Sequence, residues 1–166
     1  MSVNIALLTV TDTRTLETDK SGNILVEKIK KAKHNLVERK ICKDNKEDIK
    51  IILKEWTLKK DLDVIITTGG TGLTGRDITP EALDEIADKH IPGFGEIFRY
   101  FSLETVGTSS IQSRACAILS NGKYIFALPG SSGGVTDAWD KILVHQLDIN
   151  HKPCNFVELF PRLKEK

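Results

Sequence analysis

Residues 63–82 read Asp63-Val64-Ile65-Ile66-Thr67-Thr68-Gly69-Gly70-Thr71-Gly72-Leu73-Thr74-Gly75-Arg76-Asp77-Ile78-Thr79-Pro80-Glu81-Ala82, and this stretch decides the fold. An apolar, largely β-branched run leads into a segment with four glycines and then into a Thr-Pro-Glu helix start. The pattern predicts a buried strand, a tight loop and a helix in succession. We expect Thr79 to cap that helix, with Pro80 in its first position. Since glycines let N–H groups approach an oxyanion and the helix N-terminus points back at the loop, we predict an anion-binding site.

Polar side chains in the same stretch favour a phosphorylated ligand that is bound together with a metal ion. The guanidinium of Arg76 can hold a phosphate through two hydrogen bonds, and the carboxylate of Asp77 can hold Mg²⁺ against phosphate oxygens. Further hydroxyl donors come from the threonines of the stretch, which are Thr67, Thr68, Thr71, Thr74 and Thr79.

Two better-known phosphate motifs match parts of this loop but not its context. The spacing Gly70-x-Gly72-x-x-Gly75 fits the dinucleotide-binding fingerprint, in which the third glycine lies within the helix. Here Asp77 and Pro80 keep the chain in a loop for several more residues. A P-loop requires Lys and then Ser or Thr after its last glycine, whereas this chain continues with Arg and Asp. A nucleotide-binding oxidoreductase would also need an acidic residue on a later strand to bind a ribose, and we identify none.

A second strand, glycine loop and helix unit follows later in the chain. Residues 115–119 and 124–128 flank a hairpin turn signal, and the second of these strands runs into Pro129-Gly130-Ser131-Ser132-Gly133-Gly134. A helix is expected over residues 135–147. Two such units in one α/β sheet would bring both loops to the same edge, where they could hold the two ends of an extended anionic ligand. An ordinary strand-to-helix connection remains the alternative interpretation of this loop alone.

Asp44 follows another expected strand. Residues 3–10 and 36–42 predict a buried strand and an edge strand, and helices are expected over residues 23–32 and 46–58. Asp44 could cap the second of these helices. Asp44 and Asp77 would both lie at the carboxyl edge of the sheet.

The remaining segments are less informative. Helices are expected from residue 79 to about 89 and from Gly93 onward, in which Glu96 and Arg99 fit surface residues better than ligand-binding ones. Residues 105–114 read as a polar connection, and the Ser113-Arg114 pair at its end could simply cap the next element. The tail over residues 148–166 has no clear period and is expected along the surface or at a subunit contact.

Composition excludes several classes of protein. The 166 residues predict one domain. With 24 basic and 23 acidic side chains, the chain lacks the charge expected of a nucleic-acid binder. We expect a cytoplasmic protein without membrane contact, because neither a long apolar span nor a signal peptide is apparent. Three dispersed cysteines and four dispersed histidines predict neither disulfides nor a zinc site.

At these motifs the chain resembles the molybdopterin-binding fold shared by the molybdenum cofactor biosynthesis proteins MoaB and MogA and the first domain of gephyrin. Residues 67–82 match the family signature almost position for position, with further matches at residues 93–96, 111–114 and 128–131. The resemblance runs from about Ile5 to the end of the chain. Leu73-Thr74-Gly75 and Pro153-Cys154-Asn155-Phe156 are more similar to MoaB than to MogA. Ser132-Gly133-Gly134 departs from the Pro-containing stretch that many relatives carry there.

The resemblance implies a three-layer α/β/α fold with a mainly parallel central sheet. It also implies binding of molybdopterin, a phosphorylated pterin dithiolene, and in MogA-like members the transfer of AMP from Mg²⁺-ATP to its terminal phosphate. The alternative is a molybdopterin-binding or carrier protein without turnover. A homotrimer or homohexamer is implied as well, with aromatic residues at 94–101 and 156–160 as candidate contacts.

Carried onto this sequence, the resemblance assigns two kinds of site residue. Asp44 and Asp77 are the expected catalytic residues and the expected ligands of Mg²⁺. Gly69 to Gly72 would cradle phosphate, whereas Ser113, Arg114 and the loop from Gly130 to Gly134 would bind the pterin end. The full set of expected substrate-binding residues is Thr68, Gly69, Gly70, Thr71, Gly72, Ser113, Arg114, Pro129, Gly130 and Ser131.

Overall fold

Six strands form one sheet in the order β2-β1-β3-β6-β5-β4 in the computed structural model, which describes residues 1–165. Strands β2, β1, β3 and β6 are parallel, whereas β5 is antiparallel to both of its neighbours, β6 and the edge strand β4. The mainly parallel sheet predicted from the sequence is therefore confirmed. The strands are β1 (Asn4–Val10), β2 (Asn35–Cys42), β3 (Val64–Thr68), β4 (Lys89–His90), β5 (Cys116–Ser120) and β6 (Lys123–Leu128).

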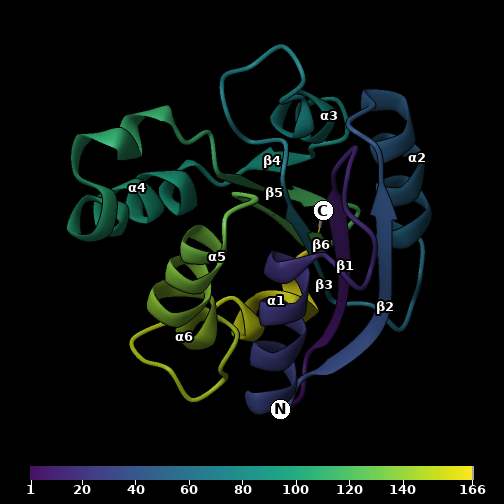
Figure 1. Cartoon of the computed structure of the whole chain (residues 1–166). Coiled ribbons are helices and arrows are strands. Elements are labelled where there is room, and N and C mark those ends of the chain that lie inside the picture. Colours follow the sequence, from purple (N-terminus) through teal and green to yellow (C-terminus); the bar gives the residue numbers. More distant parts are fainter. Residues whose placement is uncertain (166) are drawn as a thin grey trace.

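Helices cover both faces of this sheet. Figure 1 shows α1, α5 and α6 on one side and α2 on the other. The α-helices are α1 (Lys20–Lys31), α2 (Lys46–Thr57), α3 (Thr79–Asp84), α4 (Pro92–Val106), α5 (Ser132–Ala138) and α6 (Val144–Gln146). Shorter helical turns are the 3₁₀ helices η1 (Gly107–Gln112) and η3 (Val157–Arg162) and the π-helical turn η2 (Trp139–Leu143).

The core lies in two layers, one on each face of the sheet. Successive side chains of a strand point to opposite faces, so each central strand contributes to both layers. In β3, Val64 and Ile66 pack with α1, α4 and α5, whereas Ile65 packs with α2 and α3. All three side chains have no exposed surface. This explains why the central strands read as continuous apolar runs rather than as alternating patterns.

Local sequence signals set several element boundaries. Asn45 caps α2, because its side-chain oxygen accepts hydrogen bonds from the N–H groups of Glu47 and Asp48 at 3.0 and 3.1 Å. Asp44 is therefore not the cap of this helix. The β5–β6 hairpin turns through Asn121 and Gly122, both with positive φ, as its sequence predicts.

Some boundaries differ from those expected. The helix expected to reach residue 89 ends at Asp84, because the chain turns to join the sheet edge: the N–H of Asp88 donates to Leu119 O at 2.8 Å and β4 then pairs with β5. The connection expected over residues 105–114 is mostly helical, comprising the end of α4 and η1. Helix α5 begins at Ser132 rather than at 135, since the Ser131 hydroxyl caps it through the N–H of Gly134.

The tail packs against the core rather than standing free. The ring of Phe156 lies 4.7 Å from that of Tyr124, and Val157 is buried. Phe94 and Phe98 are buried in the same layer. These three phenylalanines therefore pack within the chain, whereas Tyr100, which belongs to the same expected contact set, is 63% exposed, so the expected subunit contact stays a prediction.

Among residues 1–165, no helix has both the length and the apolar character needed to cross a membrane.

Candidate functional site

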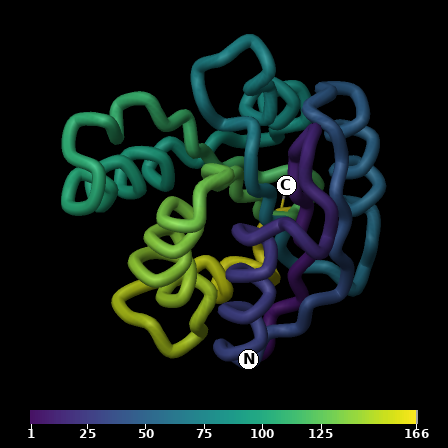
Figure 2. The backbone as a smooth tube through the Cα atoms, viewed as in Figure 1, coloured from purple at the N-terminus to yellow at the C-terminus, as the bar shows by residue number. Residues whose placement is uncertain are grey.

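Both glycine loops meet at the carboxyl edge of the sheet. They follow the paired strands β3 and β6, whose last residues, Thr68 and Leu128, lie opposite each other. The N–H of Gly69 donates to Leu128 O at 3.0 Å, and the Thr68 hydroxyl donates to Pro129 O at 2.8 Å. A Cβ on Gly130 would lie 3.3 Å from the Cα of Gly69. The predicted juxtaposition of the two loops is thus confirmed. Figure 2 shows the first loop arching beyond the end of the sheet before it enters α3.

Glycine is required at the start of the first loop. Gly69 has a φ of +102°, and a Cβ there would lie 2.2 Å from Val10 O, well inside van der Waals contact. The loop also leaves backbone donors without a protein partner. Within residues 1–165, the N–H groups of Gly70 and Thr71 donate to no protein acceptor, whereas that of Gly69 is already used by Leu128. Two adjacent free N–H groups of this kind suit an oxyanion.

Thr79 forms hydrogen bonds with this loop and does not cap α3. Its hydroxyl donates to Gly69 O at 2.9 Å, and its N–H donates to Gly70 O at 3.0 Å. The cap position is taken by Ile78, which makes no side-chain hydrogen bond to the helix. The prediction of Thr79 as the N-cap is wrong, because the hydroxyl satisfies a buried loop carbonyl rather than a helix N–H.

Asp77 lies at the end of the loop and is partly engaged within it. Its carboxylate accepts hydrogen bonds from the N–H and the hydroxyl of Thr74 at 2.9 and 2.7 Å. Burial would raise the pKa of Asp77, but these hydrogen bonds, one from the N–H of Gly72 and the charge of Arg114 lower it below its ordinary value. The side chain is thus held as a carboxylate facing Gly72.

Asp44 approaches the same loop from the end of β2. Its Oδ1 atom lies 3.3 Å from the position of a Cβ on Gly70. In the described part of the chain its carboxylate accepts no hydrogen bond, although its N–H donates to Asp12 Oδ1 at 3.2 Å. Burial and the negative charges of Asp12 and Asp77 raise the pKa of Asp44, and the charge of Arg76 opposes this rise. Arg76 itself pairs with Asp12 and is largely exposed.

The Arg114 side chain bonds to the first loop, and it also borders a hollow of about 500 Å³ together with Ser113. Its Nε donates to Gly72 O at 2.6 Å, its Nη2 donates to Asp77 O at 2.7 Å, and its Nη1 pairs with Glu81. Its N–H donates to Thr71 O at 2.9 Å. These bonds direct the guanidinium toward the protein. The neighbouring Ser113 is half-buried, and its carbonyl accepts a hydrogen bond from Arg99 at 3.3 Å.

Two hollows adjoin the second loop and share Ser131 and Ser132. A polar hollow of about 290 Å³ lies between this loop, the first loop and the segment that links β1 to α1. A larger hollow of about 580 Å³, mostly apolar, lies between the second loop, α4 and η1. The latter includes Phe98, Val106 and Ser113 in its wall. Ser113 thus borders the apolar hollow, whereas Arg114 is turned to the first loop.

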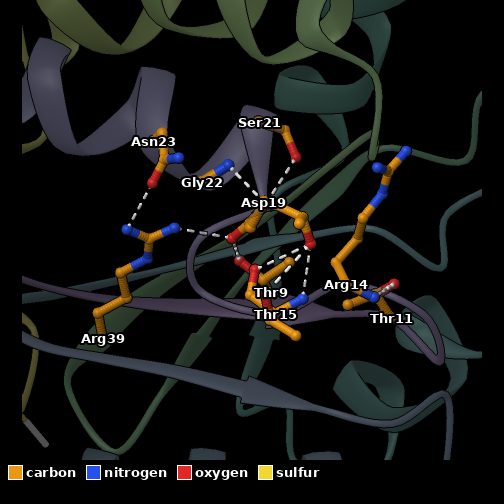
Figure 3. A network of polar contacts seen from close by, with 10 residues as sticks. Thr9, Thr11, Arg14, Thr15, Asp19, Ser21, Gly22, Asn23 and Arg39 are labelled. Carbon is orange, nitrogen blue, oxygen red and sulfur yellow. Dashed lines mark hydrogen bonds and ion pairs between the residues drawn. The ribbon is translucent and has the colours of Figure 1, made fainter.

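The segment over residues 11–22 contributes to the site, although no site residue was predicted there. Asp19 is 1% exposed and forms a network with Thr9, Ser21, Gly22 and Arg39 that Figure 3 shows. The signal that could have identified it is positional, because a polar segment that follows a buried parallel strand lies at the same edge as the other loops.

A divalent metal fits this site only together with a ligand. Among residues 1–165, no group of three or more His, Cys, Asp or Glu side chains is placed to hold a metal ion. Mg²⁺ is usually bound by one or two carboxylates and the phosphates of a substrate. The carboxylate of Asp44, with no hydrogen-bond donor among the described residues, and that of Asp77 fit that mode.

Fold and site together define a class, the α/β proteins with two glycine loops at the carboxyl edge of a mainly parallel sheet, the place where open α/β sheets bind their ligands. The chain belongs to the molybdenum cofactor biosynthesis family, since the family model described as "Probable molybdopterin binding domain" matches residues 6–149. The resemblance noted in the sequence is therefore confirmed.

Individual relatives agree with this assignment. Molybdenum cofactor biosynthesis protein B of Escherichia coli K12 is 44% identical over 161 residues, which cover 97% of this chain and 93% of the relative. The protein of the same name from Bacillus cereus is 45% identical over 146 residues, which cover 87% of this chain and 86% of the relative.

Solved structures extend the likeness to the fold. A crystal structure of molybdenum cofactor biosynthesis protein B superposes with a TM-score of 0.89 at 40% identity, covering 100% of this chain and 98% of that one. The crystal structure of the tungsten cofactor synthesizing protein MoaB from Pyrococcus furiosus gives a TM-score of 0.76 at 36% identity. The match covers 86% of this chain and 91% of that one. The expected similarity to MoaB is confirmed.

Proposed function

We propose that this protein binds molybdopterin and transfers AMP from Mg²⁺-ATP to its terminal phosphate, with residues 1–166 acting as one domain. The observation that carries the proposal is the pair of carboxylates on either side of the first loop. Asp44 faces Gly70 and Asp77 faces Gly72, from the ends of different elements. Between them, the free N–H groups of Gly70 and Thr71 can receive phosphate oxygens.

The chemistry requires placement more than a protein nucleophile. An oxygen of the molybdopterin phosphate attacks the α-phosphorus of ATP, the new P–O bond forms, and the bond to the β-phosphate oxygen breaks to release pyrophosphate. Asp44 and Asp77 would hold Mg²⁺, which supplies neutralisation of the phosphate charge when bound. The backbone of Gly70 to Gly72 would orient the phosphates, and Arg114 would keep that backbone in place.

The second loop is proposed to bind the pterin end. Its residues Pro129, Gly130 and Ser131 lie against the first loop, and Ser131 also borders the apolar hollow. A ring system could enter that hollow beside Ser113 while its phosphate remains near the first loop. Thr68 would act indirectly, because its hydroxyl is bonded to Pro129 O and fixes the spacing of the loops.

A binding or carrier protein without turnover is the second candidate. It is favoured by the hydrogen bonds between Thr74 and Asp77, which give that carboxylate a structural use within its own loop. The two candidates are separated by incubating purified protein with molybdopterin and Mg²⁺-ATP and measuring the mass of the pterin product. An adduct of one AMP per molybdopterin supports the transferase, whereas bound but unchanged molybdopterin supports the carrier.

We also propose a homotrimer or homohexamer. Exposed apolar side chains on α4 and η1 support a contact there, and the most exposed are Tyr100 (63%), Val106 (54%) and Ile111 (80%). Light scattering measures the mass directly, and a monomer at micromolar concentration would contradict the proposal.

A further inference from the structure

We propose that the polar hollow between β1 and β3 is a phosphate subsite, in which Arg14 and Lys20 bind a phosphate group of the ligand. The inference deepens the proposed function and rests on it, since it names two further binding residues for the same site. Neither residue belongs to the glycine loops or to the carboxylate pair.

The position of the hollow follows from the topology. Strands β1 and β3 are neighbours in the sheet, but the chain leaves them toward opposite faces. Helix α1 packs in one core layer through Leu25 and Ile29, whereas α3 packs in the other through Ala82 and Leu83. A crevice opens outside the carboxyl ends of two strands where connections diverge in this way, and ligands of open α/β sheets bind in it.

The net charge of the residues around the hollow is positive, because the negative charge of the buried Asp19 carboxylate is neutralised. Oδ2 of Asp19 accepts from the Thr9 hydroxyl at 2.6 Å and from Arg39 at 3.0 Å. Its Oδ1 accepts from the N–H of Gly22 at 2.9 Å and the hydroxyl of Ser21 at 3.3 Å. Figure 3 shows these donors around Asp19. The carboxylate is therefore neutralised by Arg39 and engaged on both oxygens.

Two cationic side chains remain. Arg14 and Lys20 both border the hollow and are exposed. Neither side chain makes a hydrogen bond or an ion pair with any residue that the structure describes, although Asp12 lies only two residues from Arg14. Figure 3 shows the Arg14 side chain extended away from the Asp19 network. With Asp19 and Arg39 cancelling, the hollow carries two uncompensated positive charges, which match a phosphate dianion.

The second loop supplies hydroxyl groups on the opposite wall. The Ser131 oxygen accepts the N–H of Gly134, so its own hydrogen remains free to donate. Ser132 adds a second hydroxyl at the same wall. Because both residues also border the apolar hollow, a ligand can place its phosphate on the polar side and a ring on the apolar side.

The phosphate can come from molybdopterin or from ATP, which share this chemistry. The experiment uses the full chain and isothermal titration with three ligands: molybdopterin, ATP with Mg²⁺, and inorganic pyrophosphate. Arg14→Ala and Lys20→Ala remove the two charges. Lys30→Ala is the matched control, because Lys30 is exposed on the same helix and does not border the hollow. Thermal unfolding verifies that all variants are folded, as expected for exposed side chains.

We expect each of the two substitutions to weaken binding of at least one phosphorylated ligand by roughly tenfold or more, as for loss of one charge-assisted hydrogen bond. Lys30→Ala should bind like the wild type. A loss confined to molybdopterin or to ATP identifies the source of the phosphate. Dephosphorylated pterin should bind the wild type and Arg14→Ala equally if molybdopterin is the source.

The outcomes separate this inference from the proposed function. If the wild type binds molybdopterin and ATP and neither substitution weakens either, the subsite is wrong while the proposed function stands. If the wild type binds neither, the proposed function is wrong. In that case, pyrophosphate binding that Arg14→Ala abolishes still supports the subsite, and no such binding overturns it.

Discussion

The Nη2 atom of Arg114 donates a hydrogen bond of 2.7 Å to the carbonyl oxygen of Asp77. The same guanidinium bonds Gly72 O through Nε at 2.6 Å. Arg114 therefore connects the two ends of the exposed part of the first loop, and it fixes the separation between the phosphate cradle and the carboxylate that follows it. An arginine placed in this way acts on the ligand through the loop.

Arg114→Ala should lower kcat of the proposed transfer by about 10²-fold, because displacement of a reacting group by about 1 Å costs that much. KM for molybdopterin should change little, since the guanidinium faces the protein. Arg114→Lys should fail to rescue, as an ammonium cannot bond two carbonyls and Glu81 in the same fork. Steady-state kinetics on the purified variants measures both parameters.

The control for this prediction is Arg162→Ala, because the Arg162 side chain is 68% exposed and its ion pair within residues 1–165 is with the nearby Glu165. It should leave kinetics unchanged. A large rise in KM with unchanged kcat for Arg114→Ala would instead show that Arg114 contacts the pterin, as the family resemblance implied.

Gly69→Ala should lower the free energy of unfolding by on the order of 3 kcal/mol, because the new methyl group meets Val10 O and the backbone has positive φ. Gly75→Ala is the matched change within the same loop, where a Cβ has nothing within 4 Å. That variant should be within ~0.5 kcal/mol of the wild type. Urea unfolding of both variants tests the difference, and equal stabilities would show that the loop relaxes freely around Gly69.

Asp19→Asn should destabilise the protein at neutral pH by on the order of 3 kcal/mol, since it leaves the half-buried Arg39 without its counter-charge. Burial would raise the pKa of Asp19, but hydrogen bonds from Thr9 and Gly22 and the charge of Arg39 lower it. Because the pKa of Asp19 is lower in the folded than in the unfolded protein, its ionised form stabilises the folded state at pH values above the unfolded-state pKa of about 4. This contribution is lost as the pH falls through the folded-state pKa.

The difference in free energy of unfolding between the wild type and Asp19→Asn should accordingly be constant above about pH 5 and become smaller at lower pH. Unfolding by urea between neutral and acidic pH measures it. Asp61→Asn, at an exposed turn, is the matched control for the removal of an aspartate charge. A difference that persists unchanged at the lowest pH would mean that Asp19 acts through packing or capping and not through its charge.

Much of the fold could be predicted because local patterns and tertiary packing agree. Buried parallel strands leave continuous apolar runs, and the glycine loops mark the carboxyl edge of the sheet. The end of α3 could not be predicted, because it depends on a hydrogen bond from Asp88 to the distant Leu119. The start of α5 depended on the side-chain orientation of Ser131, which the sequence does not specify.

The sequence predicted which segments form the site, but it predicted the side-chain contacts within the site less well. The sequence placed Asp44 and Asp77 at one edge, and the structure brings both to the first loop. The roles of Thr79 and Arg114 depend on which carbonyls lie within reach, and such contacts between distant segments leave no periodic signal. The segment around Asp19 was missed because its partner Arg39 comes from β2, on the far side of α1 in the sequence.

Asp44 offers the most direct test of the proposed function, because no described residue donates a hydrogen bond to its carboxylate. The measurement is the rate of formation of adenylylated molybdopterin and pyrophosphate by the wild type and by Asp44→Asn at saturating Mg²⁺-ATP, alongside molybdopterin binding by both. We predict turnover by the wild type and a loss of about 10²-fold or more in the variant, with molybdopterin affinity unchanged. Tight molybdopterin binding by the wild type without any product would contradict the account and leave a binding protein in its place.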